Sequence, residues 1–299
     1  EKRRPHREAR FAPVEAQRPR TRTRRRPQAG ALRAGLLRPA TLAAALATVL
    51  AACGPLATAG PGCRTLRAPA ALPPGLEESS GVAVSLRHPG VLWSHDDAGD
   101  LLHAVDREGT RVGTVRLPKR LRDWEDLALA SCPRGGSCLW AADTGDNYEE
   151  RGDVRLLRFP EPDPAADTVA TPDVHPVRLP DGPRDVEALL VLPGERILLV
   201  TKGRNHPVTV YRYPPPLRPE RVTLVAVQRL TDGPRILPRQ VTGGAVAPRG
   251  GVAALRTYES LRFYRVAGDT LAPLEDGLVN LRTLREPQGE GVGLGLDGE

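Results

Sequence analysis

The sequence contains no methionine, and aromatic residues make up only 4% of the chain. Because a natural start codon supplies methionine, we expect residues 1–20 to include upstream sequence that is not part of the native protein. No segment shows a long helical periodicity of 3.6 residues, which argues against a helical fold. The sequence therefore favours short β-strands as the main secondary structure.

Common catalytic motifs are also missing. The chain contains no G-x-S-x-G, G-x-x-x-x-G-K-[ST], H-E-x-x-H or C-x-x-C pattern, and the glycine run GEGVGLG matches no phosphate-binding loop. His95 and His103 flank an acidic turn and are candidate general bases, although a lone histidine in a loop is more often a polar surface residue. The sequence therefore gives no strong motif for an enzyme.

The positive charge is confined to the N-terminal segment. The formal net charge is +7, but residues 1–38 contain 13 Lys and Arg against 3 acidic residues, which leaves 30 basic and 33 acidic residues for the rest. We interpret residues 1–30 as a basic extension. Because the remaining chain is slightly acidic, we expect no nucleic-acid partner.

An uncharged, alanine-rich run over residues 39–52 follows this basic segment and ends at Cys53. The run is shorter than the roughly 20 residues that a membrane-spanning helix needs, and a basic stretch before a short apolar run is typical of a secretory signal. The residues LAAC resemble the lipobox of bacterial lipoproteins, in which the cysteine is lipidated and becomes the new N-terminus. We therefore predict a signal peptide over residues 31–53, lipidation of Cys53 and a membrane-anchored, extracytoplasmic protein. A cleaved signal of a secreted or periplasmic protein, and a buried alanine-rich helix with a chance cysteine, remain the alternatives.

Four cysteines are present, and export implies an oxidising compartment. Cys132 and Cys138 bracket the loop PRGGS between two strand-like runs, which predicts a disulfide across a hairpin. The two have no histidine nearby, so they do not form a zinc site. Cys63 lies in a Pro/Gly/Ala-rich linker over residues 54–76, and it has no assigned partner.

A repeat organises residues 77–299. Similar strand heads recur at intervals of roughly 45 to 60 residues, and each of the first four is followed by three further strand-like runs. The five heads are SSGVAVS (79–85), DWEDLALA (123–130), DVEALLV (185–191), VTGGAVA (241–247) and QGEGVGL (288–294). This ordered recurrence predicts an all-β fold, a β-propeller of four-stranded blades, rather than a β-sandwich. Four blades are nearly complete and a fifth begins at Gln288; because an open blade edge is unfavourable, we expect the natural chain to continue beyond Glu299.

These strings together also carry a family resemblance. The set DWEDLAL, LWAADTGDN, RLLRFPEP, DVEALLV and EPQGEGV resembles a group of uncharacterised bacterial exported β-propeller (lipo)proteins. That group is distantly similar to phytase-like and NHL-type propellers. The resemblance covers roughly residues 77–299 and implies the propeller fold and an extracytoplasmic location, but no settled activity.

Superposing the heads brings acidic residues to one level of the central channel. Glu125, Glu187 and Glu290 occupy equivalent positions, where the other two heads carry Ser80 and Gly243. Converging carboxylates raise one another's pKa or require a cation. One interpretation is a bound Ca²⁺, to which Asp143 and Asp146 in the loop DTGDN would add oxygen ligands. The other is neutralisation by basic side chains at equivalent strand ends, namely Lys202 and Arg256.

Two functions remain open at the level of sequence. The first is a monomeric binding module of the cell envelope that takes an unidentified ligand or protein at the channel mouth. The second is a Ca²⁺-dependent hydrolase of phosphoesters or lactones, in which the three glutamates hold the ion and Lys202 and Arg256 bind an anionic group. Among the tryptophans, we expect Trp93 and Trp140 in the core and Trp124 between blades.

Overall fold

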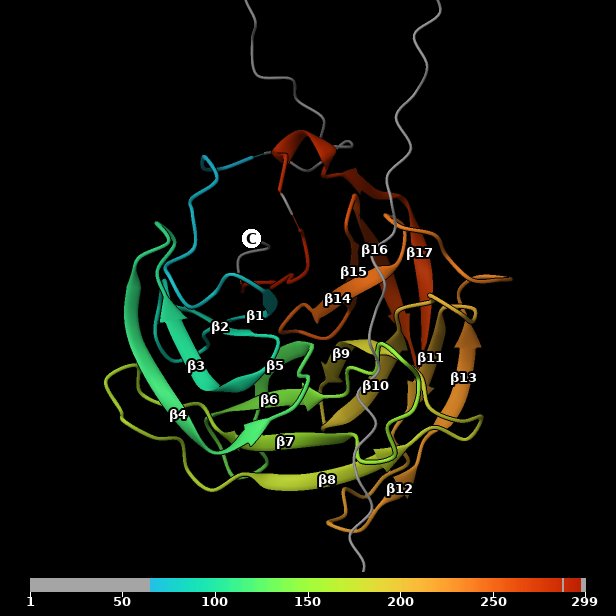
Figure 1. Ribbon diagram of the computed structural model, residues 1–299, viewed down its shortest axis with the longest axis horizontal. Helices are drawn as coiled ribbons and strands as arrows, with labels where there is room; N and C mark the ends of the chain where they lie inside the picture. Colours follow the sequence, from blue (N-terminus) through green and yellow to red (C-terminus); the bar gives the residue numbers. More distant parts are fainter. Residues whose placement is uncertain (1–64, 287, 297–299) are drawn as a thin grey trace, which may run out of the picture. The chain divides into compact units, whose positions relative to one another are not determined.

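A computed structural model describes residues 65–286 and 288–296. Their regular secondary structure is β-strand, apart from one short 3₁₀ helix (Figure 1). They form four separate sheets, and each contains four consecutive or nearly consecutive antiparallel strands. This arrangement confirms the predicted propeller of four-stranded blades. Within the described residues, no helix is long and apolar enough to cross a membrane.

In the first two blades, the four strands are arranged in chain order, with the first strand innermost and the fourth outermost. Blade 1 contains β1 (Ser79–Val84), β2 (Leu92–Asp96), β3 (Gly99–Val105) and β4 (Arg111–Leu121). Blade 2 contains β5 (Asp126–Ser131), β6 (Ser137–Asp143), β7 (Arg155–Pro160) and β8 (Asp173–Arg178). Each blade thus begins at a predicted head, because the head's alternating small and aliphatic residues suit an inner strand.

The last two blades repeat this pattern. Blade 3 contains β9 (Val186–Leu192), β10 (Arg196–Thr201), β11 (Thr209–Arg212) and β13 (Val225–Arg229). Blade 4 contains β14 (Val241–Val246), β15 (Val252–Thr257), β16 (Ser260–Ala267) and β17 (Thr270–Asn280), and a short 3₁₀ helix, η1 (Arg282–Leu284), follows. Positive backbone φ angles at Gly194 and Gly250 allow the tight turns between the first two strands of these blades.

The outer edge of blade 3 departs from the repeat. Residues 221–230 form one uninterrupted strand-like run in the sequence. Instead, β12 (Val222–Thr223) pairs in parallel with β8 of blade 2, and only β13 remains in blade 3. Val222 and Leu224 are buried in the apolar cluster between these two blades, which accounts for the diversion of the chain.

The hydrophobic core lies between neighbouring blades. One cluster joins blades 1 and 2 and includes Trp93 and Trp124, and another joins blades 2 and 3 and includes Trp140. All three tryptophans are fully buried, as predicted. A third cluster joins blades 3 and 4 through residues such as Leu190 and Leu255. Inter-blade packing therefore holds the inner strands in place around the channel.

The carboxylate of Asp126 links three inner strands at the channel. This fully buried side chain accepts hydrogen bonds from the backbone N–H groups of Leu127 (2.9 Å), Leu189 (2.8 Å) and Gly244 (3.2 Å). These donors belong to β5, β9 and β14, which come from blades 2, 3 and 4. Asp126 therefore fixes the relative positions of the strand heads.

Both ends of the described chain contact blade 1. In the predicted linker, Arg67 forms an ion pair with Glu108 in the β3–β4 turn (2.6 Å). In the predicted fifth head, Gly291 lies against Val82 of β1, and Thr242 of β14 donates a hydrogen bond to the carbonyl of Gly289 (3.1 Å). Residues 288–294 thus lie between β14 and β1, without forming a strand (Figure 1).

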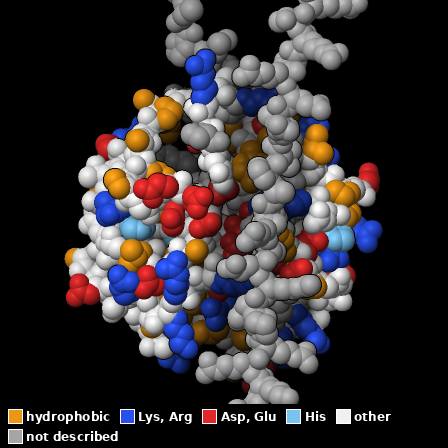
Figure 2. Space-filling view, viewed as in Figure 1, with side chains coloured by type: hydrophobic (Ala, Val, Ile, Leu, Met, Phe, Trp, Pro, Cys, Tyr) orange, Lys and Arg blue, Asp and Glu red, His pale blue; other side chains and the backbone are white. Residues whose placement is uncertain are grey.

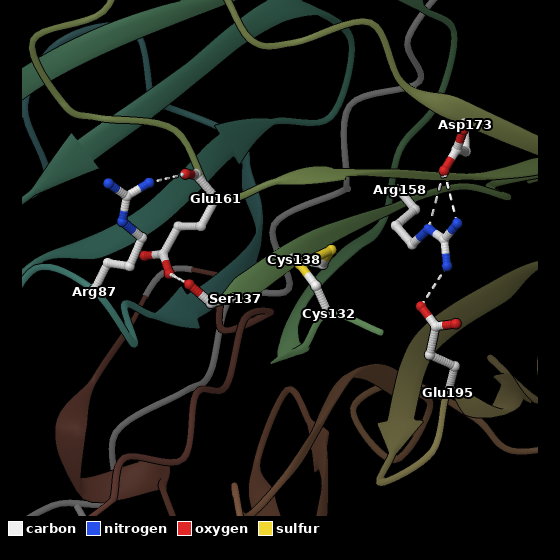
Figure 3. The surroundings of a disulfide bond; sticks show 8 residues. All are labelled: Arg87, Cys132, Ser137, Cys138, Arg158, Glu161, Asp173 and Glu195. Atoms are coloured by element: carbon white, nitrogen blue, oxygen red, sulfur yellow. Dashed lines mark hydrogen bonds and ion pairs between the residues drawn. A yellow bond between two sulfur atoms is a disulfide. The ribbon is translucent and has the colours of Figure 1, made fainter. Parts of the chain in front are cut away.

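The predicted disulfide is confirmed. Cys132 and Cys138 are joined across the β5–β6 hairpin, with their Cα atoms 5.1 Å apart (Figure 3). The ladder pairs Ala130 with Cys138 and Ser131 with Ser137, which brings the cysteines together. Cys53, Cys63 and the signal segment lie outside the described residues.

Candidate functional site: an acidic channel mouth

Three acidic side chains stand where inner strands begin. Glu125 precedes β5, while Asp185 precedes β9 and Glu187 is its second residue. Asp185 and Glu187 share a face, because alternate residues of a strand point to the same side. Acidic side chains are visible near the middle of the face drawn in Figure 2. We name Glu125, Asp185 and Glu187 the acidic triad.

The triad is compact and buried. One carboxylate oxygen from each residue lies within 4.8 Å of the other two, and the three residues are only 1–6% exposed. Lys202, directly after β10, places its Nζ in contact with Glu187 Oε1 and 3.5 Å from Asp185 Oδ2. Within the described part of the chain, Glu125 has no basic side chain at ion-pair distance. The predicted neutralisation by lysine therefore reaches only part of the acid group.

The protonation equilibria reflect this incomplete neutralisation. Burial raises the pKa of Glu125 well above its usual range, and the carboxylates of Glu187 and Asp185 raise it further. Burial and Asp185 also raise the pKa of Glu187, although Lys202 opposes them. Burial alone would lower the pKa of Lys202, but Glu187 and Asp185 outweigh it and raise that pKa. Glu125 and Glu187 therefore bind protons more readily than isolated glutamates do.

Asp185 carries an unsatisfied oxygen. Its Oδ1 accepts a hydrogen bond from the backbone N–H of Asp146 (2.9 Å), whereas its buried Oδ2 has no hydrogen-bond donor. Among residues 65–286 and 288–296, the charges that face Oδ2 are those of Lys202 at 3.5 Å and Arg204 at 3.7 Å. A buried carboxylate oxygen without a donor is costly, so this atom is suited to bind a cation.

A glycine allows the DTGDN loop to approach the acids. A side chain at Gly145 would overlap Glu125 Oε1 and the carboxyl group of Asp123. Asp123 is half-buried, and burial together with Asp185 raises its pKa. The loop backbone therefore closes directly over the acidic residues, which a residue with a Cβ atom would prevent.

The predicted ligands Asp143 and Asp146 have structural partners instead. Asp143 forms buried ion pairs with Arg151 (2.8 Å) and Arg155 (2.9 Å). The carboxylate of Asp146 accepts backbone hydrogen bonds from Glu150 and Arg151 and so closes its own loop. Both carboxylates therefore have structural partners, and a ligand role for either stays a prediction. Asp146 contributes indirectly, because its backbone N–H orients Asp185.

Glu290 and Arg256 lie apart from the triad. Glu290 accepts hydrogen bonds from Gln288 (2.6 Å) and Ser80 (3.3 Å), although its charge still influences Glu187. Arg256 pairs with Glu286 and donates to the carbonyl of Gly291 (2.9 Å). The expected pairing of Arg256 with the acid cluster is therefore wrong, because this arginine holds the C-terminal segment against β15.

The two candidate histidines are not surface groups. His95 is fully buried, with its ring 4.0 Å from that of Trp124. Burial lowers the pKa of His95 to about 4, and the pKa of His103, also buried, is lowered, first by burial. Both are interior residues near blade 1 rather than general bases facing solvent.

Sequence reasoning did not include Asp185 among the ligands. The signal was present, because Asp185 stands two residues before Glu187 as Asp123 stands two residues before Glu125. The role of Asp126 was also missed, since no sequence pattern indicates that its carboxylate binds strands of two other blades.

Comparisons with known proteins give fold-level likenesses only. No family model and no curated protein sequence matches the chain. A streptogramin B lyase structure is 13% identical with a TM-score of 0.41, over 77% of this chain and 63% of the lyase. The PQQ-bound aldose sugar dehydrogenase of Streptomyces coelicolor is 14% identical with a TM-score of 0.43, over 79% of this chain and 90% of that protein. A gluconolactonase of Xanthomonas campestris is 14% identical with a TM-score of 0.40, over 74% of this chain and 66% of the gluconolactonase.

The chain spans less than two thirds of the streptogramin B lyase and of the gluconolactonase. At these identities and TM-scores, the likenesses carry no inference about activity. The four blades themselves define the class of protein, a β-propeller. Its distinguishing feature is the buried acidic triad at one end of the channel.

Proposed function

We propose that the protein is an exported, lipid-anchored β-propeller that binds its ligand at the channel mouth through a Ca²⁺ ion held by the acidic triad. The main support is the convergence of three buried carboxylate oxygens within 4.8 Å, together with the donor-free Oδ2 of Asp185. Ca²⁺ lies about 2.3–2.6 Å from its oxygen ligands, so two ligands of one ion are separated by at most about 5 Å. The three oxygens therefore fit a single ion.

The donor set favours Ca²⁺ over Mg²⁺. Mg²⁺ keeps several waters and is usually bound by one or two carboxylates, whereas Ca²⁺ accepts several carboxylates in flexible geometry. Lys202 neutralises part of the charge on Glu187 and Asp185, so the ion compensates mainly Glu125. With three protein oxygens, the ion retains positions for water or for oxygens of an anionic ligand. Arg204, near Asp185 and about one third exposed, is placed to contact such a ligand.

Calcium binding is measurable directly. After dialysis against EDTA, isothermal titration with CaCl₂ at pH 7.5 should show one site per chain. Removing a charged ligand in Glu125→Gln or Asp185→Asn should weaken binding at least about tenfold. The matched variant Glu220→Gln, at an exposed position, should leave it unchanged. At pH 5 the wild-type affinity should fall, because the raised pKa values let protons compete with the ion. The absence of both binding heat and a Ca²⁺-induced rise in melting temperature would contradict the proposal.

The hydrolase alternative uses the same ion. The ion held by the acidic triad would then polarise the substrate and activate a water molecule. Incubation of the Ca²⁺-saturated protein with p-nitrophenyl phosphate and with a simple lactone separates the two functions. Hydrolysis is supported if the protein turns over a substrate, EDTA abolishes the turnover and Glu220→Gln preserves it. Ca²⁺ binding without turnover supports the binding module.

The membrane anchor has a separate test. In cells fed an alkyne-bearing fatty acid, the protein should become labelled, and the label should be lost in Cys53→Ser. The physical reason is that thioether attachment of the lipid requires the cysteine sulfur. Cys63→Ser is the matched control and should retain full labelling. A label that persists in Cys53→Ser would refute the anchor.

A further inference from the structure

A cleft of about 960 Å³ lies at the opposite end of the blades from the acidic triad. Strands β5 and β9 begin beside the acids and run to this end, where the disulfide hairpin and the turn at Gly194 and Glu195 form part of its wall. The cleft extends between blades 2 and 3. Its volume is within the range of small-molecule sites, about 300–1,000 Å³.

Much of the wall is apolar. Leu217, the adjacent exposed prolines Pro215 and Pro216, and the Cys132–Cys138 disulfide line the cleft. The disulfide rigidifies one side because it closes the hairpin (Figure 3). Such surfaces bind the apolar part of a ligand by removing it from water.

Positive charge dominates the polar part of the wall. Five arginines and three acids line the cleft: Arg87, Arg134, Arg158, Arg196 and Arg212, with Asp173, Glu195 and Asp269. Arg158 has carboxylates on both sides, Asp173 at 2.7 Å and Glu195 at 2.5 Å (Figure 3). Arg196 and Arg212 share the single carboxylate of Asp269, at 3.5 Å and 3.2 Å.

The nearby buried carboxylate of Glu161 does not cancel this excess. Its oxygens accept hydrogen bonds from Ser85, Trp93 and Ser137, while Arg87 donates to its backbone carbonyl (3.0 Å) rather than to its carboxylate (Figure 3). Even when Glu161 is counted, guanidinium groups outnumber carboxylates around the cleft. Guanidinium groups in excess of carboxylates bind anions through charge-assisted hydrogen bonds.

From the apolar wall, the volume and the excess of guanidinium groups together, we infer that this cleft binds an organic anion with an apolar body, such as a carboxylate or sulfonate attached to an aromatic group. The anionic end lies against the arginines and the apolar body against Leu217, Pro215 and Pro216. This site is distinct from the acidic channel mouth and needs no metal ion.

The test uses the fluorescent anion 8-anilinonaphthalene-1-sulfonate, with EDTA present so that the channel mouth plays no part. It should bind saturably at one site per chain, and at least about tenfold more tightly than the uncharged analogue N-phenyl-1-naphthylamine. Raising NaCl to 1 M should weaken binding, because salt screens the arginines. The double variant Arg87→Gln/Arg134→Gln should bind the sulfonate about tenfold more weakly.

Two further variants make the result specific. Thr171→Trp places an indole in the cleft from an exposed lining position and should abolish binding. Arg120→Gln removes an exposed arginine of β4 outside the cleft and should change nothing. Equal affinity for the charged and uncharged probes, or unchanged sulfonate binding in the double variant and in Thr171→Trp, would overturn the inference.

Discussion

Replacing Asp126 by alanine should lower the free energy of unfolding by about 4 kcal/mol, since it removes the acceptor of three buried N–H groups. An unsatisfied buried donor costs about 1–3 kcal/mol, and the three donors belong to three different inner strands. Asp126→Asn should be less damaging, because the side-chain carbonyl oxygen still accepts hydrogen bonds. Urea unfolding monitored by tryptophan fluorescence measures both changes.

Asp106→Ala is the matched control for this experiment. Asp106 also accepts two backbone N–H groups, from Glu108 (3.0 Å) and Thr110 (2.7 Å), but in an exposed turn where water replaces it. Its loss should cost less than about 1 kcal/mol. Equal effects of Asp126→Ala and Asp106→Ala would show that the buried carboxylate does not hold the blades together. In the proposed function, Asp126→Ala should also weaken Ca²⁺ binding, because Glu125 and Glu187 are positioned by the strands that it joins.

Replacing Lys202 by methionine should destabilise the metal-free protein by about 3–5 kcal/mol at pH 8, the usual cost of leaving a buried carboxylate without its partner. Lys202 is the basic residue in contact with Glu187. The loss should shrink as the pH falls toward 5, because the variant's Glu187 can then take up a proton. The direction of this pH dependence follows from the raised pKa of Glu187. A carboxyl group that binds protons more readily in the folded state than in the unfolded state stabilises the fold at low pH.

Adding Ca²⁺ distinguishes two explanations for a loss of stability in Lys202→Met. If the triad binds Ca²⁺, saturating Ca²⁺ should restore most of the stability of Lys202→Met, and the variant should bind the ion more tightly than the wild type. If the acids serve only as partners of Lys202, Ca²⁺ should leave the variant unstable. Lys119→Met, which removes an exposed lysine of β4, controls for the change of residue type. Melting curves at pH 5 and pH 8, with Ca²⁺ and with EDTA, provide the complete comparison.

The strand heads show which parts of the architecture can be predicted from sequence. Strand-like runs in a recurrent order specify a four-stranded unit locally, and Cys132 and Cys138 lie on either side of one hairpin, so their pairing follows from register. The pairing of β12 with β8 could not be predicted in this way. It depends on the burial of Val222 and Leu224 between two blades, which is a long-range contact.

In the acidic triad, too, some features could be predicted from the sequence and others could not. The repeat brings Glu125 and Glu187 to one level, and the matched spacing of Asp123 and Asp185 was visible in the sequence. Arg256 and Lys202 both lie near the ends of second strands, yet Arg256 contacts Glu286 and Gly291 instead of the acids. A place near a strand end does not fix the direction of a long side chain, because its end selects among all charged partners within reach.

The sequence by itself determined the all-β repeat, the hairpin disulfide and the recurrence of acids at strand heads, because each depends on residues close together in one blade. Only the tertiary structure decided which acids converge, that Lys202 leaves Asp185 Oδ2 without a donor, and that arginines from several blades line a common cleft. The physical reason is that charge compensation and burial arise between blades, where residues distant in sequence meet.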